Sequence, residues 1–161
     1  MKNLSDLLLL GDERLYEKCA LVNHEELPLV TTWVADLDNV MSQIRAKYNF
    51  GRAIAAPQLG IMKRLVYMNI DKPVVFINPE FTELSNEMFT LWDDCMSFPN
   101  LFVRVKRHKN LKIKFKDMHW VEHEWFLEDA LSELLQHEVD HLDGVLCTMR
   151  AVDAKAFRMK L

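Results

Sequence analysis

Cysteine is scarce in this sequence. The 161 residues contain three, Cys19, Cys95 and Cys147. An odd number without regular spacing excludes the disulfide framework that is typical of small secreted proteins. We therefore expect reduced cysteines and a cytoplasmic location.

Long apolar runs and an excess of positive charge are also missing. The first apolar run, residues 7–10, is too short for the core of a signal peptide. No segment approaches the roughly 20 apolar residues of a membrane-spanning helix. The formal net charge of -4 gives no electrostatic support for direct binding to nucleic acids or anionic membranes.

The sequence has no internal repeat, low-complexity stretch or Gly/Ser linker, so we expect one domain over residues 1–161. Residues 30–47 have the apolar spacing of an amphipathic helix, and Thr31 or Thr32 could cap it. Residues 129–142 contain no Pro or Gly and predict a second helix, which Gly144 would end.

Short apolar runs between the two helices predict strands. Residues 64–70 and 74–81 flank a turn and indicate a hairpin, and residues 101–107, 111–117 and 123–129 indicate further strands. Strands followed by a helix favour an α+β fold. We expect a mostly antiparallel sheet packed around the carboxy-terminal helix, with an amphipathic helix near the amino terminus.

The second predicted helix carries the sequence QHEVDH. His137 and His141 are four residues apart and share one face, so they could bind one metal ion. Glu138 lies about 100° around the helix from His137, where its carboxylate could take a proton from a metal-activated water. The same string can also occur by chance in an ordinary amphipathic helix.

A catalytic metal usually has three protein ligands and a water. The candidates for the third are the three cysteines, a carboxylate, and His108, His119 or His123. Cys147 lies in an apolar run that is more typical of a core. Cys95 follows Asp93 and Asp94, which disfavour a thiolate unless a cation offsets them, and a metal would supply that cation. Burial as a small residue and a role as nucleophile remain alternatives for Cys95.

Three segments together resemble the peptide deformylases. They are GRAIAAPQ (residues 51–58), DDCMS (residues 93–97) and HEVDH (residues 137–141), in the order and spacing of the family. The resemblance covers nearly the whole chain. It implies the peptide deformylase fold and a metal-dependent hydrolase that removes the formyl group from N-formylmethionyl peptides or nascent chains.

The resemblance also implies roles for single residues. It assigns the metal to one thiolate and two imidazoles, those of Cys95, His137 and His141. Glu138 would be the general acid/base, and Gln58 and the backbone N–H of Met96 would bind the oxyanion. The metal would be Fe²⁺ by resemblance, although one cysteine and two histidines alone favour Zn²⁺, and Ni²⁺ or Co²⁺ would also suit them.

The resemblance implies substrate contacts at six positions, Gly51, Arg52, Ala53, Ile54, Asp94 and Glu133. Four of these positions depart from the family pattern. Asp94 and Ala53 replace glycines, while Arg52 and Glu133 replace apolar residues near the methionine pocket. Arg52 and Glu133 could form an ion pair there, or both could lean into solvent. By resemblance, Asp93 pairs with Arg107.

Four functions remain open from the sequence. The first is a deformylase of N-formyl peptides, with association to the ribosome as a further expectation. The second is a deformylase of another small or polar N-formyl compound. The third is a non-catalytic binding protein, although no catalytic residue is lost. The fourth is a structural metal protein, which would leave Glu138 and Gln58 without a role.

Overall fold

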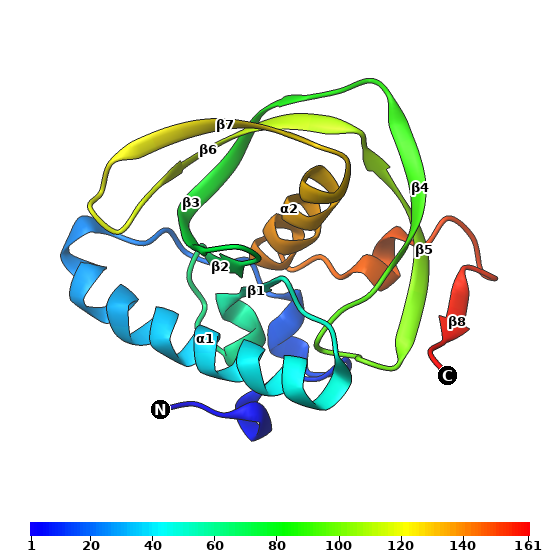
Figure 1. Cartoon of the computed structure of the whole chain (residues 1–161), viewed down its shortest axis with the longest axis horizontal. Coiled ribbons are helices and arrows are strands. Elements are labelled where there is room, and N and C mark those ends of the chain that lie inside the picture. The colour runs from blue at the N-terminus through cyan, green and yellow to red at the C-terminus, as the bar shows by residue number, and fades with distance from the viewer.

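The computed structural model describes all 161 residues and has an α+β fold, as the sequence predicts. It contains the helices α1 (Leu27–Tyr48) and α2 (Asp129–Leu142), eight strands and five short 3-10 helices. Strands surround α2 on several sides, and α1 lies across the bottom of the molecule (Figure 1). No helix combines the length and the apolar composition needed to cross a membrane.

The strands form two sheets, and their pairing is antiparallel, as the sequence predicts. The larger has the order β1 (Ala53–Ala55), β2 (Leu65–Asn69), β3 (Pro73–Leu84), β6 (Asn110–Lys116) and β7 (Glu122–Glu128). The smaller has the order β4 (Met88–Asp93), β5 (Leu101–His108) and β8 (Phe157–Met159). The predicted hairpin is confirmed as β2 and β3, which pair from Leu65↔Ile77 to Asn69↔Pro73.

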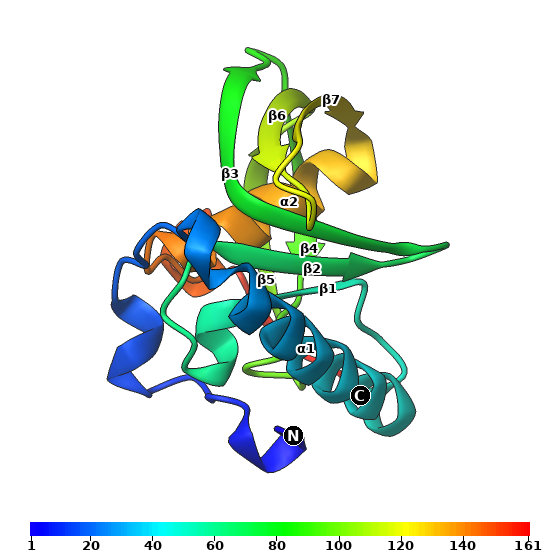
Figure 2. The ribbon, with the colours of Figure 1, turned by 90° about the vertical axis from the view of Figure 1, so that its left-hand side faces the viewer.

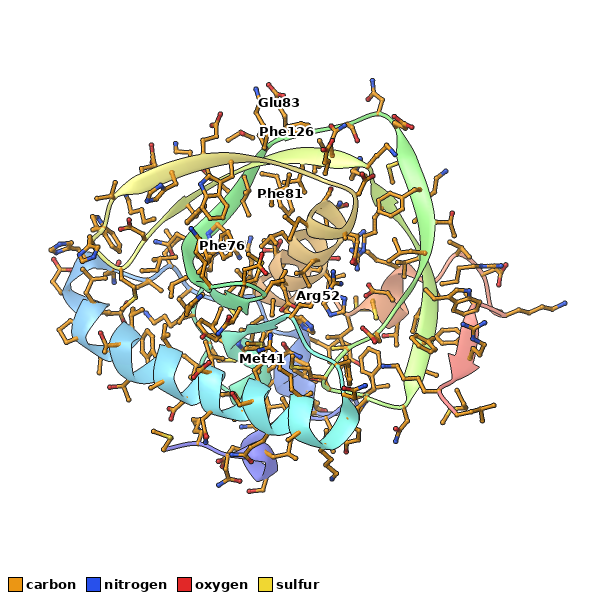
Figure 3. The ribbon with its side chains drawn as sticks, viewed as in Figure 1. Met41, Arg52, Phe76, Phe81, Glu83 and Phe126 are labelled. Carbon is orange, nitrogen blue, oxygen red and sulfur yellow. The ribbon has the colours of Figure 1, made fainter.

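Helix α2 has the predicted bounds and lies between the sheets. Leu134, Leu135, Val139 and Leu142 pack with Phe76 of β3 and with apolar residues of β6 and β7 (Figure 3). Its other side carries polar side chains that are also buried, including His137, Glu138 and His141. A buried polar group is costly unless it has a partner, so this side of α2 requires matching groups from elsewhere.

Helix α1 supports the site from below. It begins three residues earlier than predicted, with Pro28 in the first turn, a position that proline favours. The expected cap at Thr31 or Thr32 is therefore wrong, and the Thr31 hydroxyl instead contacts the Leu27 carbonyl at 3.4 Å. The apolar face of α1, including Met41, packs beneath β1 and β2, whereas α2 lies on their other side (Figures 2 and 3).

Strand β1 fits between the two helices because its side chains alternate. Ile54 enters the core cluster that contains α1, while Ala53 and Ala55 enter the cluster that contains α2. The small alanine side chains allow α2 to approach the sheet. The chain then turns through a 3-10 helix, Ala56–Leu59, which carries Gln58.

Gly144 follows the end of α2 with a φ of 72°, and a Cβ there would lie 2.6 Å from the Tyr16 carbonyl carbon. Gly60 has nearly the same φ, 73°, but its Cβ would meet only the Arg14 side chain, at 3.5 Å. Gly60→Ala should cost about 1–2 kcal/mol for the left-handed conformation, and Gly144→Ala clearly more, because backbone must move. Urea unfolding of both variants tests this, and equal losses would contradict a tight junction at Gly144.

Candidate active site

Cys95, His137 and His141 meet in the structure as the sequence analysis expected. The Nε2 atoms of the two histidines are 3.2 Å apart, and Cys95 Sγ lies 3.5 Å from His141 Nε2. All three side chains are buried. Tetrahedral ligands at about 2.0–2.1 Å (nitrogen) and 2.3 Å (sulfur) from a metal are about 3.3–3.6 Å from one another. The donor set therefore fits a single metal ion in both chemistry and spacing.

The two histidines and the cysteine come from different elements. His137 and His141 lie one turn apart on α2, while Cys95 lies just beyond the end of β4. The Phe98 N–H donates to the Cys95 carbonyl at 3.1 Å and closes a turn around the thiol. Side chains alternate along β4, so its last residue, Asp93, points inward toward α2.

Asp93 fixes the orientation of His137. Its Oδ2 accepts hydrogen bonds from His137 Nδ1 at 2.9 Å and from Arg107 Nη2 at 2.9 Å. Because Nδ1 donates to Asp93, Nε2 is the ring nitrogen left for a metal, which would displace the proton there, and it faces the other two ligands. The expected pair of Asp93 and Arg107 is thus present.

The sequence analysis missed the continuation of this network to the surface. Arg107 Nη1 donates to Asp140 at 2.7 Å, and Asp140 also accepts from Arg150 Nη2 at 2.8 Å. Asp140 lies three residues after His137 and thus on a neighbouring part of the helix surface. This spacing is the only feature of the sequence that points to a role for Asp140, and it does not predict which arginines contact it.

The charges of this network act on the ligands. Burial alone would lower the pKa of His137, but the Asp93 carboxylate overrides it and raises this pKa well above its usual value. Burial and the neighbouring His137 charge lower the pKa of His141 well below its usual value. His141 is therefore a neutral imidazole, the form that binds a metal.

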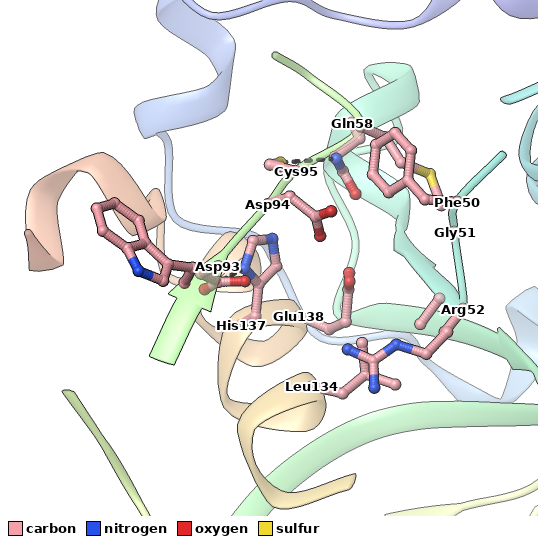
Figure 4. A pocket seen from close by; sticks show the side chains of 13 residues that line it. Phe50, Gly51, Arg52, Gln58, Asp93, Asp94, Cys95, Leu134, His137 and Glu138 are labelled. Atoms are coloured by element: carbon pink, nitrogen blue, oxygen red, sulfur yellow. Dashed lines mark hydrogen bonds and ion pairs between the residues drawn. The ribbon is translucent and has the colours of Figure 1, made fainter. Parts of the chain in front are cut away.

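Glu138 lies beside the ligands with its carboxylate directed into a pocket (Figure 4). The residue is 4% exposed, and its Oε2 has no hydrogen-bond partner. Burial raises the pKa of Glu138 to about 7. An unpartnered carboxylate oxygen with this pKa is suited to accept and return a proton at neutral pH.

Gln58 is held in one orientation on the opposite side of the pocket. Its Oε1 accepts a hydrogen bond from the Ala55 N–H at 3.0 Å. Its Nε2 donates to Ser97 Oγ at 3.1 Å and to Cys95 Sγ at 3.5 Å (Figure 4). The amide nitrogen is thereby directed toward the candidate metal ligands.

The pocket has a volume of about 350 Å³ and contains most of the expected substrate contacts. Gly51, Arg52, Ala53 and Asp94 line it, together with Met96. Gly51 has a φ of 125°, a backbone conformation that favours glycine, and a Cβ there would also displace the end of the Met96 side chain, 2.7 Å away. Ile54 does not line the pocket, because its side chain is fully buried against the α1 core.

Arg52 and Glu133 form the ion pair that the sequence analysis considered. Arg52 Nη2 lies 2.7 Å from Glu133 Oε1, with side-chain exposures of 42% and 8%. The alternative in which both side chains lean into solvent is therefore wrong for Glu133. Glu133 does not line the pocket, whereas the Arg52 side chain forms a wall of it (Figure 4).

Cys147 is buried, as the sequence analysis expected for a core residue, but it lies close to the site. Its sulfur is within 4.8 Å of both a His137 nitrogen and an Asp93 oxygen. Burial raises the pKa of Cys147 to about 11, so it is a neutral thiol at physiological pH. Cys147 therefore packs against His137 as an uncharged group and leaves the hydrogen bond between His137 and Asp93 in place.

Comparisons with known proteins agree with this geometry. Residues 4–157 match the family model described as polypeptide deformylase. The peptide deformylase of Thermotoga maritima is 38% identical over 121 residues, which cover 73% of each chain. That of Thermotoga petrophila is 34% identical over 134 residues, covering 81% of this chain and 82% of the relative.

Solved structures show the same similarity. The crystal structure of the Thermotoga maritima enzyme matches with a TM-score of 0.80 and 32% identity, covering 91% of this chain and 97% of the other. A peptide deformylase of Acinetobacter baumannii, crystallised with Met-Ala-Ser bound, matches with a TM-score of 0.77 and 30% identity. That match covers 89% of this chain and 96% of the other.

Asp93→Asn should weaken metal binding by about 10- to 100-fold, because an amide cannot hold both His137 Nδ1–H and Arg107 as a carboxylate does. Competition with a chromogenic chelator measures the affinity. Asp94→Asn is the matched control, because Asp94 contacts Lys160 and none of the three ligands. Equal affinities for the two variants would show that Asp93 does not orient His137.

Proposed function

The chain belongs to the polypeptide deformylase family and is a deformylase, and from this premise we propose how its residues remove the formyl group from N-formylmethionyl peptides. The observation that carries the proposal is the convergence of Cys95, His137 and His141 beside the unpartnered Glu138 oxygen. The reaction consumes one water and yields formate and a free amino terminus.

Cys95, His137 and His141 hold the divalent metal in this proposal. The 3.2 Å and 3.5 Å separations among their donor atoms support this assignment. When bound, the metal would polarise the formyl carbonyl and acidify the attacking water. We propose Fe²⁺ on the basis of the family resemblance, with Zn²⁺, Ni²⁺ and Co²⁺ as other ions that these donors accept.

Glu138 moves the proton. Its Oε2 takes a proton from the attacking water and delivers it to the amine nitrogen as the carbon–nitrogen bond breaks. The absence of a hydrogen-bond partner at Oε2 supports this role, because a structural carboxylate at 4% exposure would be expected to have one.

Gln58 and the backbone N–H of Met96 stabilise the oxyanion that forms on the formyl oxygen. Gln58 Nε2 lies 3.5 Å from Cys95 Sγ, so one of its hydrogens is directed toward the reacting centre. The hydrogen bonds of Gln58 to Ala55 and Ser97 hold it in place, which removes the cost of reorienting it during the reaction.

We propose that the pocket receives the methionine of a formylated peptide, with Leu134 and the Arg52 guanidinium as its walls. The name of the relatives and the Met-Ala-Ser complex of one of them favour peptides over other small formyl compounds. A site for nascent chains would operate in the cytoplasm, near the ribosome. The three unpaired cysteines agree with a reducing compartment.

Glu138→Gln should keep one bound metal per chain but lower kcat by about 10²- to 10⁴-fold, because the amide cannot carry the proton. Formate release from formyl-Met-Ala-Ser and metal analysis of the same sample measure both properties. Glu133→Gln, a buried glutamate on the same helix, should change KM more than kcat. If Glu138→Gln loses the metal instead, Glu138 is a ligand and the assignment fails.

Adding Zn²⁺ to the anaerobic Fe²⁺ protein should displace the iron, because nitrogen and sulfur ligands bind Zn²⁺ more tightly than Fe²⁺. The proposal that Fe²⁺ is the native metal predicts that kcat/KM falls as the exchange approaches one equivalent. Metal content and formate release are followed together. A rise in kcat/KM during the exchange would identify zinc as the better metal.

A further inference from the structure

One face of the smaller sheet carries alternating cations and aromatic rings. The pairing places Trp92 of β4 opposite Arg104 of β5, and Phe102 of β5 opposite Arg158 of β8. Lys160 follows Arg158 by two residues, just after β8. We call these residues, Trp92, Phe102, Arg104, Arg158 and Lys160, the cation–aromatic row.

Contacts across the strands hold the row together. The Arg158 guanidinium lies 4.4 Å from the centre of the Trp92 ring and 5.4 Å from that of Phe102. Arg104 lies 5.7 Å from the Trp92 ring on the same face. Such stacking fixes a guanidinium in place without using its N–H groups, which remain free to bind a ligand.

The row continues into the wall of the pocket. Trp92 lines the pocket, and so do Asp94 and Phe50. Lys160 contacts both of these residues as well as the ring of Phe102. Lys160 Nζ lies 2.7 Å from Asp94 Oδ2 and 3.7 Å from the centre of the Phe50 ring. Lys160 thus bridges two separate segments of the pocket wall, one with Phe50 and one with Asp94.

Arg158 is the cation of the row that has no acidic partner. Lys160 neutralises Asp94, and Arg104 lies 3.4 Å from Asp153. Arg158 is exposed, and its only contacts to charged or aromatic groups are the two rings. The surface beside the pocket is therefore locally positive although the whole chain carries a net charge of -4.

We propose that the cation–aromatic row binds the substrate segment that follows the formylated residue, with Arg158 selecting peptides that carry an acidic side chain there. The inference rests on the proposed function, since it requires a formyl peptide in the pocket. A carboxylate close to Arg158 would accept two parallel hydrogen bonds from a guanidinium that stacking has already positioned. A lysine at the same substrate position would be repelled.

The test compares formyl-Met-Ala-Xaa-Ala amides in which Xaa is Asp, Asn or Lys. For the metal-loaded enzyme at low ionic strength, we expect kcat/KM to be about threefold higher for Asp than for Asn, and lowest for Lys. The preference should fade near 1 M salt, where charges are screened within about 3 Å. Formate release measures all three substrates in the same way.

Variants locate the preference. Arg158→Gln should bring the Asp and Asn peptides to the same kcat/KM, and Arg158→Lys should restore part of the difference because it keeps the charge. Lys160→Ala should reduce or reverse the preference, since Asp94 is then an unpaired carboxylate beside the pocket. Lys72→Gln, which removes an exposed charge from the turn between β2 and β3, is the matched control and should keep the full preference.

The outcomes separate this inference from the proposed function. If none of the peptides releases formate, the proposed function fails. If all three are hydrolysed equally well at low salt, or if Arg158→Gln keeps the preference, the deformylase assignment stands and the role of Arg158 is wrong.

Discussion

The hydrogen bond between Asp93 and His137 is the interaction on which the rest of the site depends. Both side chains are about 5% exposed, and Arg107, at 2%, completes the buried group. Removing one partner from such a group costs about 3–5 kcal/mol, because the others are left charged and unpaired. The same bond sets the tautomer of His137, so one contact contributes both to the fold and to metal binding.

The fold brings this group together by enclosing one helix between two sheets. The smaller sheet supplies Asp93 and Arg107, and its strand β4 leads directly into Cys95. The larger sheet supplies β1, whose alanines let α2 come close, and the turn that holds Gln58. Each side chain of the site thus lies on, or next to, a strand or helix that is itself fixed by its packing in the core.

Much of this arrangement could be predicted from the sequence. The period of residues 129–142 and the glycine after them gave α2 correctly, and the motif resemblance gave its partner Cys95. Strands β1, β4 and β8 were missed. Strands β1 and β8 have three residues each, too few for a visible alternation, and both exist through pairing with distant segments. Ile54 was misassigned because alternation in β1 turns it away from its neighbours Ala53 and Ala55. The link from Asp140 to Arg150 depends on tertiary contacts that residue spacing does not encode.

The burial of the central part of α2 has a consequence for how the protein opens. Residues 132–139 are all buried, so no part of this segment is free to fray while the two sheets stay in place. We therefore expect the amide hydrogens of this segment to exchange with solvent mainly when the core opens. The part of the catalytic centre that lies on α2 is thus as resistant to local opening as the core itself.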